Sequence, residues 1–237
     1  MTDDRWPSSR LDPANPSSWE HHTFPGMLIT VDGVDGSGRA TQIDLLETWL
    51  KMQGYGVVRT SWNSSKLVSK TIAEARRQRT LAARTYSILH AIDMAERNDN
   101  EVIPALRAGY VVLADRYVYT AFARDIARGV EIDWILNLYG FAVRPDLSVY
   151  LRIDAETSLG RVMGIAGEST IEEADEQAGV RGKLGSFRQF QERVVAEYEQ
   201  FVRPFDMVAL DAREPVRRQQ LELRSIVAGM LERMESA

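Results

Sequence analysis

The sequence has no cysteine, few histidines and no long apolar run. Without cysteine there are no disulfide bonds, thiol nucleophiles or thiolate metal sites, and three histidines are too few for an imidazole cage around a metal. The longest apolar stretches, such as 110–114, are much shorter than the roughly 20 residues that cross a bilayer, and the N-terminus lacks a signal-like segment. We therefore expect a cytoplasmic protein without structural zinc and without membrane contact.

Basic residues are somewhat fewer than acidic residues. The chain has 29 Lys plus Arg against 34 Asp plus Glu, and its net charge of −5 excludes a global field that would attract nucleic acid. Any anion-binding site must therefore be local. With 237 residues, of which 44% are hydrophobic and 27% charged, the chain is large enough for one domain with a sizeable core.

Proline and serine gather at the N-terminus. Four of the eight prolines lie within residues 1–26, with Ser8, Ser9, Ser17 and Ser18 between them. This composition disfavours regular structure, so we predict a flexible tail over 1–26 and a single domain over 27–237. Trp6, Trp19 and Phe24 are candidates to pin parts of the tail to the domain, whereas His21 and His22 are predicted to be exposed rather than metal ligands.

From Met27 onward, strand patterns alternate with helical patterns. Apolar runs predict strands at 27–31, 57–61, 110–114, 147–153 and 207–210. Helices are expected from residue 39 to Gly54, over 66–79 and 81–97, and at the C-terminus, where Leu223, Ile226, Val227, Met230 and Leu231 form one stripe. Such alternation predicts a parallel sheet with helices on both faces, and ligands of this fold bind at the carboxyl ends of the strands.

The strongest motif is the glycine-rich segment between the first strand and the first helix. It reads Asp32-Gly33-Val34-Asp35-Gly36-Ser37-Gly38-Arg39-Ala40-Thr41. Its glycines let the backbone curl so that successive N–H groups point inward, and the helix start adds the positive end of its dipole. The segment therefore predicts a phosphate cradle, with an ordinary strand-to-helix turn as the alternative.

This loop departs from the usual phosphate-loop pattern, which ends Gly-Lys-Ser/Thr. Arg39 stands where the lysine is expected, and its planar guanidinium does not fill the slot of a compact ammonium group in the same way. Ala40 cannot ligate magnesium, and Thr41 offers a hydroxyl only from the next position of the helix. The sequence therefore favours nucleotide binding more strongly than rapid turnover.

A second motif is the Asp115-Arg116 pair at the end of the apolar run 110–114. The acid is placed to hold a magnesium-bound water, and the forked guanidinium of Arg116 suits a phosphate group. The alternative is a salt-bridged strand edge.

In their order along the chain, these motifs resemble the thymidylate kinase family of nucleoside monophosphate kinases. The resemblance rests on residues 32–38 followed by Thr41-Gln42, on 102–106, on Asp115-Arg116-Tyr117 with Thr120, on 144–147 and on 210–212. It implies a three-layer α/β P-loop NTPase fold with a five-stranded parallel sheet, helices on both faces and a lid segment at about 164–186. It also implies ATP with Mg2+ as the donor, a nucleoside monophosphate as the acceptor, dTMP by default, and a homodimer.

The resemblance assigns roles to matching positions. The donor nucleotide would be bound by Gly33, Gly36, Ser37, Gly38, Arg39, Ala40 and Thr41, with Arg161 near the adenine. The acceptor would be bound by Asp35, Arg116, Tyr117, Thr120 and Arg124. Asp35 and Asp115 would support the metal, and Asp35, Arg39 and Arg116 would carry catalysis.

The chain departs from the family's pattern on the acceptor side as well. The family's Asp-Arg pair on the helix before the central strand, whose arginine contacts thymine, appears here as Asp93-Met94. The segment 61–65 lacks the arginine that often follows the second strand, and the lid carries an acidic run between Gly167 and Gln177. Three hypotheses follow: an enzyme that phosphorylates a nucleoside monophosphate, a non-catalytic nucleotide-binding paralogue that serves as partner or regulatory subunit of an intact kinase, or a protein that keeps the fold without binding nucleotide.

Overall fold

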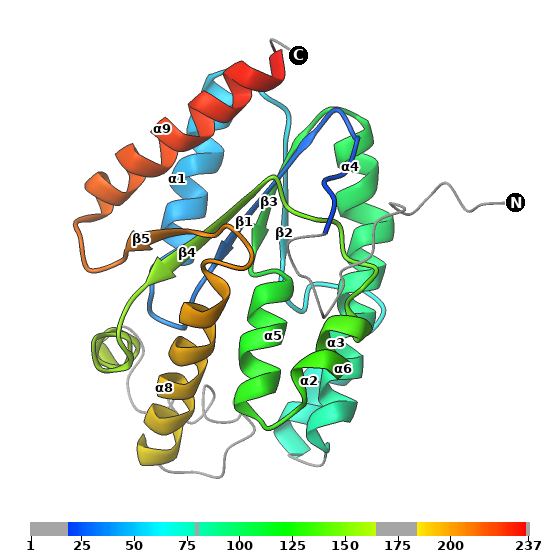
Figure 1. Cartoon of the computed structure of the whole chain (residues 1–237), viewed down its shortest axis with the longest axis vertical. Coiled ribbons are helices and arrows are strands. Elements are labelled where there is room, and N and C mark those ends of the chain that lie inside the picture. The colour runs from blue at the N-terminus through cyan, green and yellow to red at the C-terminus, as the bar shows by residue number, and fades with distance from the viewer. Residues whose placement is uncertain (1–18, 79–80, 165–183, 236–237) are drawn as a thin grey trace, which may run out of the picture.

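The computed structural model describes residues 19–78, 81–164 and 184–235. Within them, five parallel strands form one sheet in the order β2-β3-β1-β4-β5 (Figure 1). The strands are β1 (Met27–Asp32), β2 (Val57–Ser61), β3 (Val111–Asp115), β4 (Leu147–Arg152) and β5 (Val208–Asp211). The fold class predicted from the sequence is therefore confirmed: a parallel α/β sheet with helices around it.

The helices connect and cover the strands. They are α1 (Arg39–Met52), α2 (Ser69–Gln78), α3 (Ala83–Arg97), α4 (Ile103–Arg107), α5 (Val118–Ala127), α6 (Ile132–Leu138), α8 (Leu184–Phe201) and α9 (Val216–Glu235), with a π-helical turn, η2 (Asn98–Val102), between α3 and α4. Residues 155–164 are also helical. No helix in the described ranges is both long enough and apolar enough to span a bilayer.

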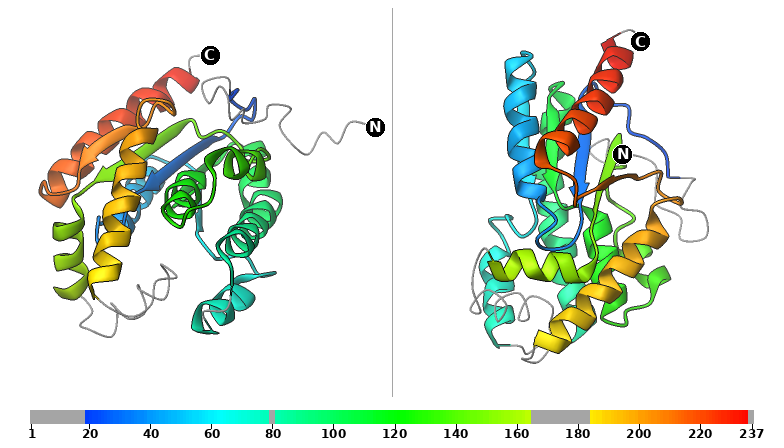
Figure 2. Two further views of the ribbon diagram at one scale, coloured as in Figure 1. Left: turned by 60° about the horizontal axis from the view of Figure 1, so that its bottom comes forward. Right: turned by 90° about the vertical axis from the view of Figure 1, so that its left-hand side faces the viewer.

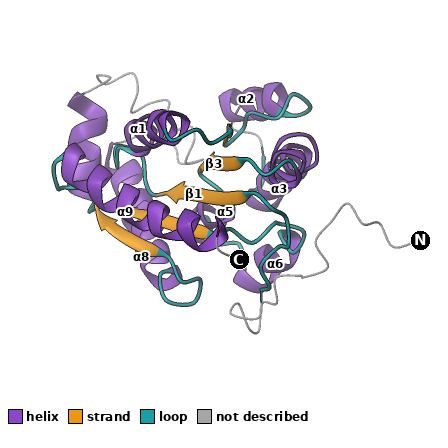
Figure 3. Cartoon of the chain, turned by 90° about the horizontal axis from the view of Figure 1, so that it is seen from above, coloured by secondary structure: helices purple, strands orange, loops and turns teal. Residues whose placement is uncertain are grey.

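The strand order determines which helices share a face of the sheet. The chain moves from β1 outward to β2 through α1 and then reverses direction, so right-handed crossovers put α1 on one face and the later connections on the other. In Figure 3, β1 and β3 lie between α1 and α5. Helix α1 packs with α9, whereas α5 packs with α8, α3 and α6 (Figure 2).

The central strands are buried on both sides, as parallel strands under two helical layers must be. Every residue of β1 is buried, and the α1 residues Ile43, Leu46 and Leu50 pack into the same core. On α9 the predicted stripe is confirmed: Leu223, Val227 and Leu231 are buried, and Ile226 and Met230 pack against the core partly buried.

The register brings the functional ends of the strands together. Val31 of β1 lies opposite Asp115 of β3, and Asp115 lies opposite Ser61 of β2. The predicted third and fifth strands start and end one residue later than expected, so that Asp115 and Asp211 belong to their strands rather than to the following loops. The shift keeps both acidic groups at the carboxyl edge.

Residues 19–26 lie against the domain instead of standing away from it. Trp19 is 1% exposed, and its ring contacts Phe205 edge-on at 6.4 Å between centroids. The prediction of an exposed His22 is wrong: its side chain is 2% exposed, and its Nε2 lies 2.9 Å from Asp146 Oδ2. His21 is exposed. Residues 1–18 of the predicted tail and residues 165–183 of the predicted lid lie outside the described residues.

Candidate functional site

The loop between β1 and α1 has the backbone of an anion cradle. Gly33, Gly36 and Gly38 all have positive φ, and at Gly36 a β-carbon would lie 2.6 Å from the carbonyl oxygen of Ser158, so only glycine fits there. Helix α1 begins after Gly38 without a side-chain cap. Its first-turn amides are therefore not taken by a capping side chain, which is the arrangement that binds phosphate at helix N-termini.

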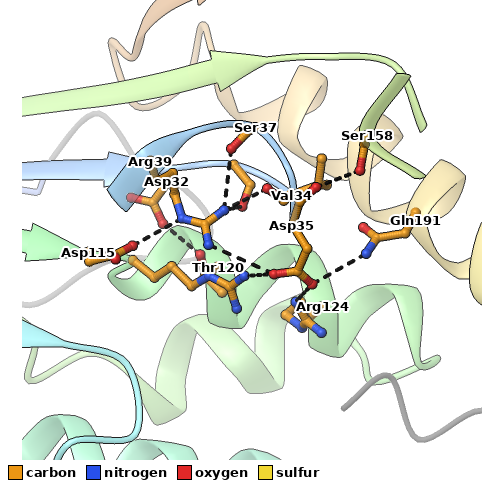
Figure 4. A network of polar contacts seen from close by, with 12 residues as sticks. Asp32, Val34, Asp35, Ser37, Arg39, Asp115, Thr120, Arg124, Ser158 and Gln191 are labelled. Carbon is orange, nitrogen blue, oxygen red and sulfur yellow. Dashed lines mark hydrogen bonds and ion pairs between the residues drawn. The ribbon is translucent and has the colours of Figure 1, made fainter. Parts of the chain in front are cut away.

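The guanidinium of Arg39 lies inside this loop (Figure 4). Its Nη1 donates to the carbonyl oxygens of Gly33 and Val34, both at 2.6 Å, and lies 3.4 Å from Ser37 Oγ. Its Nε donates to Asp115 Oδ1 at 3.1 Å. Arg39 therefore ties the phosphate loop to the end of β3, which a lysine, with a single nitrogen at its tip, could not do in the same way.

A cluster of arginines surrounds Asp35. Arg116 Nη2 binds Asp35 Oδ1 directly, Arg124 Nη1 lies 3.5 Å from Oδ2, and Gln191 Nε2 lies 3.4 Å from the same oxygen. Arg39 Nη2 is 3.9 Å from Oδ1. Several positive groups therefore converge on one carboxylate at the carboxyl edge of the sheet (Figure 4), where ligands of this fold bind.

The electrostatics of the cluster follow from this geometry. Burial opposes ionisation of Asp35, but the guanidinium groups of Arg116, Arg124 and Arg39 hold the pKa of its carboxyl well below the usual range. Burial also lowers the pKa of Arg124 to about 10, whereas for Arg116 the effect of burial is outweighed by Asp35, which raises its pKa. Asp35, Arg116 and Arg124 are therefore charged at neutral pH.

The carboxylates predicted to hold a metal are both paired with arginines. Asp115 Oδ1 accepts from Arg39 Nε, and Asp115 Oδ2 lies 3.9 Å from Arg59 Nη2. Ala40 supplies no hydroxyl in place of the usual Ser or Thr. As arranged, this donor set does not fit a divalent cation held directly by Asp35 and Asp115. Among the described residues, no group of three or more His, Asp or Glu is arranged for metal binding. The metal roles of Asp35 and Asp115 stay predictions.

Behind the loop, Asp32 organises a buried polar support. Its Oδ1 accepts from the backbone N–H of Tyr117 at 3.1 Å and from Thr120 Oγ1 at 2.8 Å. Thr120 Oγ1 also lies 2.6 Å from the hydroxyl of Tyr198. Burial raises the pKa of Asp32, and the two hydrogen bonds only partly oppose it. The backbone N–H of Tyr117 and the hydroxyl of Thr120, two positions predicted as acceptor-binding, thus bind groups within the protein.

The helical segment 155–164 holds the loop from the side of β4. Ser158 Oγ donates to the carbonyl oxygen of Asp35 at 2.6 Å. Arg161 Nη1 lies 3.3 Å from the carbonyl oxygen of Gly36, and its Nη2 donates to that of Ala212 at 2.9 Å. Arg161 therefore touches the phosphate loop and the segment after β5. Its predicted place beside the adenine stays a prediction.

On the acceptor side, the arginine partner of Asp93 is Arg97, one helical turn beyond Met94. Arg97 Nε donates to Asp93 Oδ2 at 3.0 Å, and both side chains are buried, as is Met94. The Trp62 ring stacks on His90 at 4.6 Å between centroids. Met94, which stands at the position of the family's thymine-contacting arginine, is therefore part of the core, and Trp62 with His90 forms an aromatic surface next to it.

The structure therefore brings most of the predicted site residues to one edge of the sheet. Around the loop these are Gly33, Asp35, Gly36, Ser37, Gly38, Arg39, Asp115, Arg116, Arg124 and Arg161. Ala40 and Thr41 lie exposed on the first turn of α1. The sequence does not predict the contacts of Gln191 and Ser158, because both lie on helices without a recognisable motif. It also does not predict that Asp32, the first residue of the glycine-rich motif, supports the loop from behind.

Comparison with known proteins agrees with this geometry. The family model described as thymidylate kinase matches residues 31–220. A protein of Saccharolobus solfataricus named "Probable thymidylate kinase 2" is 34% identical over 206 residues, which cover 85% of this chain and 95% of that protein. A "Probable thymidylate kinase" of Thermococcus gammatolerans is 35% identical over 148 residues, covering 59% of this chain and 71% of that protein.

Proposed function

Because this chain belongs to the thymidylate kinase family, we propose that it transfers the γ-phosphoryl group of ATP to a nucleoside monophosphate, with dTMP as the first acceptor to test. The observation that carries the proposal is the convergence of Arg39, Arg116 and Arg124 on a glycine loop at the carboxyl edge of the sheet. The names of the relatives support dTMP as the acceptor. Nothing in the comparisons favours the non-catalytic alternative.

Phosphoryl transfer makes few covalent demands on the protein. It requires the two phosphates to be held in line and positive charge to be placed around the transferring group. The loop 33–38 and the start of α1 would hold the donor phosphates. Arg116 and Arg124, which flank Asp35 in the structure, would bind the acceptor phosphate, because forked guanidinium groups match its oxygens. Asp35 then separates the two phosphate sites and keeps these arginines oriented.

Magnesium would enter this site with ATP, bound to the oxygens of the nucleotide itself. The residues present do not offer it an open carboxylate, since Asp115 accepts from Arg39 and Asp35 from Arg116. We therefore propose ATP with Mg2+ as the donor but assign no step to a protein-bound metal. Positive charge at the loop comes from the arginines.

The base of the acceptor would lie near Trp62, whose half-buried ring stacks on His90, while the ring of Tyr86 contacts His90 edge-on at 4.6 Å. An aromatic surface of this kind suits a planar base, because stacking does not depend on a particular hydrogen-bond pattern. Met94 stands at the position of the family's thymine-contacting arginine. We therefore expect the protein to discriminate only weakly between dTMP and other pyrimidine monophosphates, all of which offer the same phosphate to Arg116 and Arg124.

The test is a coupled assay of ADP formation from ATP with dTMP, dUMP, dCMP, dAMP and dGMP as acceptors, in the presence of magnesium. We expect dTMP to give the highest kcat/KM. The matched control is Arg213→Ala, which removes an exposed arginine whose partner, Asp211, lies on β5; it should leave turnover unchanged. If no acceptor stimulates ADP formation above the rate with ATP alone, the proposed function is wrong.

We further propose that the protein is a cytoplasmic homodimer. Ile88 and Ile92 are exposed one turn apart on α3, and Ile132 is exposed on the neighbouring α6. Light scattering at several protein concentrations tests self-association. Mixing with an intact kinase paralogue would reveal a heteromer instead.

A further inference from the structure

The space between the phosphate loop and Asp115 is where P-loop enzymes keep their metal. Two groups of the protein usually face that metal: the hydroxyl of the residue after the loop lysine and an acid at the end of a neighbouring strand. In this chain the first is replaced by the methyl group of Ala40. The second is Asp115, which keeps its position at the end of β3 but is engaged by Arg39.

Both oxygens of Asp115 face guanidinium groups. Oδ1 accepts from Arg39 Nε at 3.1 Å, and Oδ2 lies 3.9 Å from Arg59 Nη2. A divalent ion bound to Asp115 would have to displace one of these cations or lie beside both. Placing like charges side by side in a partly buried site is unfavourable, because the local dielectric constant is lower than in water.

Arg39 makes contacts that no single ammonium group makes. One nitrogen of its fork donates to the carbonyl oxygens of Gly33 and Val34, while another donates to Asp115. Guanidinium presents five N–H donors in fixed directions, so it can bind the loop and the strand end at the same time and still have a donor left for a phosphate oxygen. Its Nη2 is directed toward Asp35, at 3.9 Å.

We propose that the guanidinium of Arg39 occupies the place of the protein-bound metal between the phosphate loop and Asp115. The charge of the donor polyphosphate is then balanced by the guanidinium of Arg39. Magnesium would be bound by the nucleotide alone and would add little to the affinity of the protein for the nucleotide. This inference rests on the proposed function, since it concerns the same donor site. It goes further in stating that Asp115 is a partner of Arg39 and not a metal ligand.

The experiment is isothermal titration calorimetry of the full chain with the non-hydrolysable ATP analogue AMP-PNP, in excess magnesium and in excess EDTA. The comparison variant is Arg39→Lys with Ala40→Thr, which rebuilds the usual phosphate-loop pattern. Ala40→Thr alone controls for the added hydroxyl. In the original chain, removing magnesium should change Kd by less than about threefold, and in the double variant it should weaken binding by about tenfold or more, a difference that calorimetry resolves readily.

Equal magnesium dependence in the original chain and the double variant would overturn the inference while leaving the proposed function in place. Absence of any AMP-PNP binding in either condition would overturn both. A second measurement does not depend on the double variant folding: Mn2+ titrated into the ADP complex and followed by electron paramagnetic resonance. Asp115→Asn should leave Mn2+ affinity unchanged, and a tenfold or greater loss, about 1.4 kcal/mol, would identify Asp115 as a metal ligand and contradict the proposal.

Discussion

Two arginine–aspartate pairs of this protein have nearly the same hydrogen-bond length and very different surroundings. Arg97 Nε lies 3.0 Å from Asp93, and Arg39 Nε lies 3.1 Å from Asp115. The side chains of the first pair are 0% and 1% exposed, whereas those of the second are 12% and 18% exposed. The distance therefore says little about the role of either pair, and burial and the remaining partners decide it.

The first pair holds part of the fold. Asp93 also accepts from the backbone N–H groups of Asn63 and Ser65, and Arg97 Nη1 donates to Thr60 Oγ1. The pair thereby holds the segment after β2 against α3. This segment includes Asn63, whose positive φ is uncommon for a residue other than glycine. The second pair joins a ligand loop to a strand end, at an edge that water and ligands can reach.

The largest expected effect is on stability and comes from Asp93→Ala. The substitution leaves the charge of Arg97 buried without its carboxylate and frees two backbone N–H groups, so the free energy of unfolding should fall by about 3–5 kcal/mol. Urea unfolding followed by circular dichroism measures this. The control is Asp93→Asn with Arg97→Met, which removes both charges and should cost less than Asp93→Ala. A loss below about 1 kcal/mol for Asp93→Ala would mean that the pair contributes no more than a surface ion pair.

The next effect concerns catalysis. Removing Arg116 also takes one cation from Asp35, but Arg124 and Arg39 still face that carboxylate, so the loss of stability should be smaller than for Asp93→Ala. Arg116 has a φ of 69°, so asparagine, which tolerates this conformation, removes the guanidinium with little backbone strain. We expect Arg116→Asn to lower kcat/KM with dTMP by a factor of about 10²–10³, the loss typical of one charge-stabilising group. A thermal unfolding midpoint well above the assay temperature would show that the loss is not caused by unfolding. A drop of less than threefold would remove Arg116 from the site.

The sequence was sufficient for the sheet and for most of the loop. Short apolar runs and a glycine-rich turn are local signals, and they predicted five parallel strands and the position of the cradle before α1. The support from Ser158 and Gln191 could not be predicted, because each contacts Asp35 across more than a hundred residues of chain. The family's pattern has its arginine directly after the aspartate, so it does not predict the pairing of Asp93 with Arg97 one helical turn later.

His22 shows a different reason for a wrong prediction. Its neighbours in the sequence are mostly polar, which favours exposure, but the side chain is buried where it pairs with Asp146, directly before β4. Asp146 Oδ2 also accepts from the backbone N–H of Leu28 at 2.7 Å. A long-range acceptor therefore outweighed the local composition, and no pattern within residues 19–26 indicates it.

A smaller effect is expected when the second pair is broken. Arg39→Ala removes the bond to Asp115 and the bonds to two loop carbonyl groups, but water can reach this edge and replace them, so the free energy of unfolding should fall by only about 1 kcal/mol. Affinity for AMP-PNP without magnesium should fall by about tenfold or more, as a lost charge-assisted bond implies. Thermal unfolding and calorimetry measure the two effects on the same sample. A stability loss as large as that of Asp93→Ala would show that the two pairs have the same structural role.

The smallest effect distinguishes Asp32, the last residue of β1, from Asp35 of the following loop by the pH dependence of their contributions to stability. Burial raises the pKa of Asp32 above its ordinary value of 3.8, so its ionisation costs stability, and that cost grows as the pH rises from the ordinary value through the raised one. Asparagine keeps the oxygen that accepts from Tyr117 and Thr120. Asp32→Asn should therefore match the original chain at low pH and exceed it by about 1 kcal/mol at neutral pH.

Asp35 should behave in the opposite sense, because its pKa is held below 3.8. Its contribution to stability is fully present above the ordinary pKa and is lost as the pH falls toward the lowered one, so Asp35→Asn should be less stable than the original chain at neutral pH and approach it in acid. Urea unfolding between about pH 3 and 7 compares the three proteins over the range in which ordinary and raised carboxyl groups titrate. If the two variants differ from the original chain with the same sign at neutral pH, the arginines around Asp35 do not compensate its burial, and the charge arrangement proposed for the phosphate site is wrong.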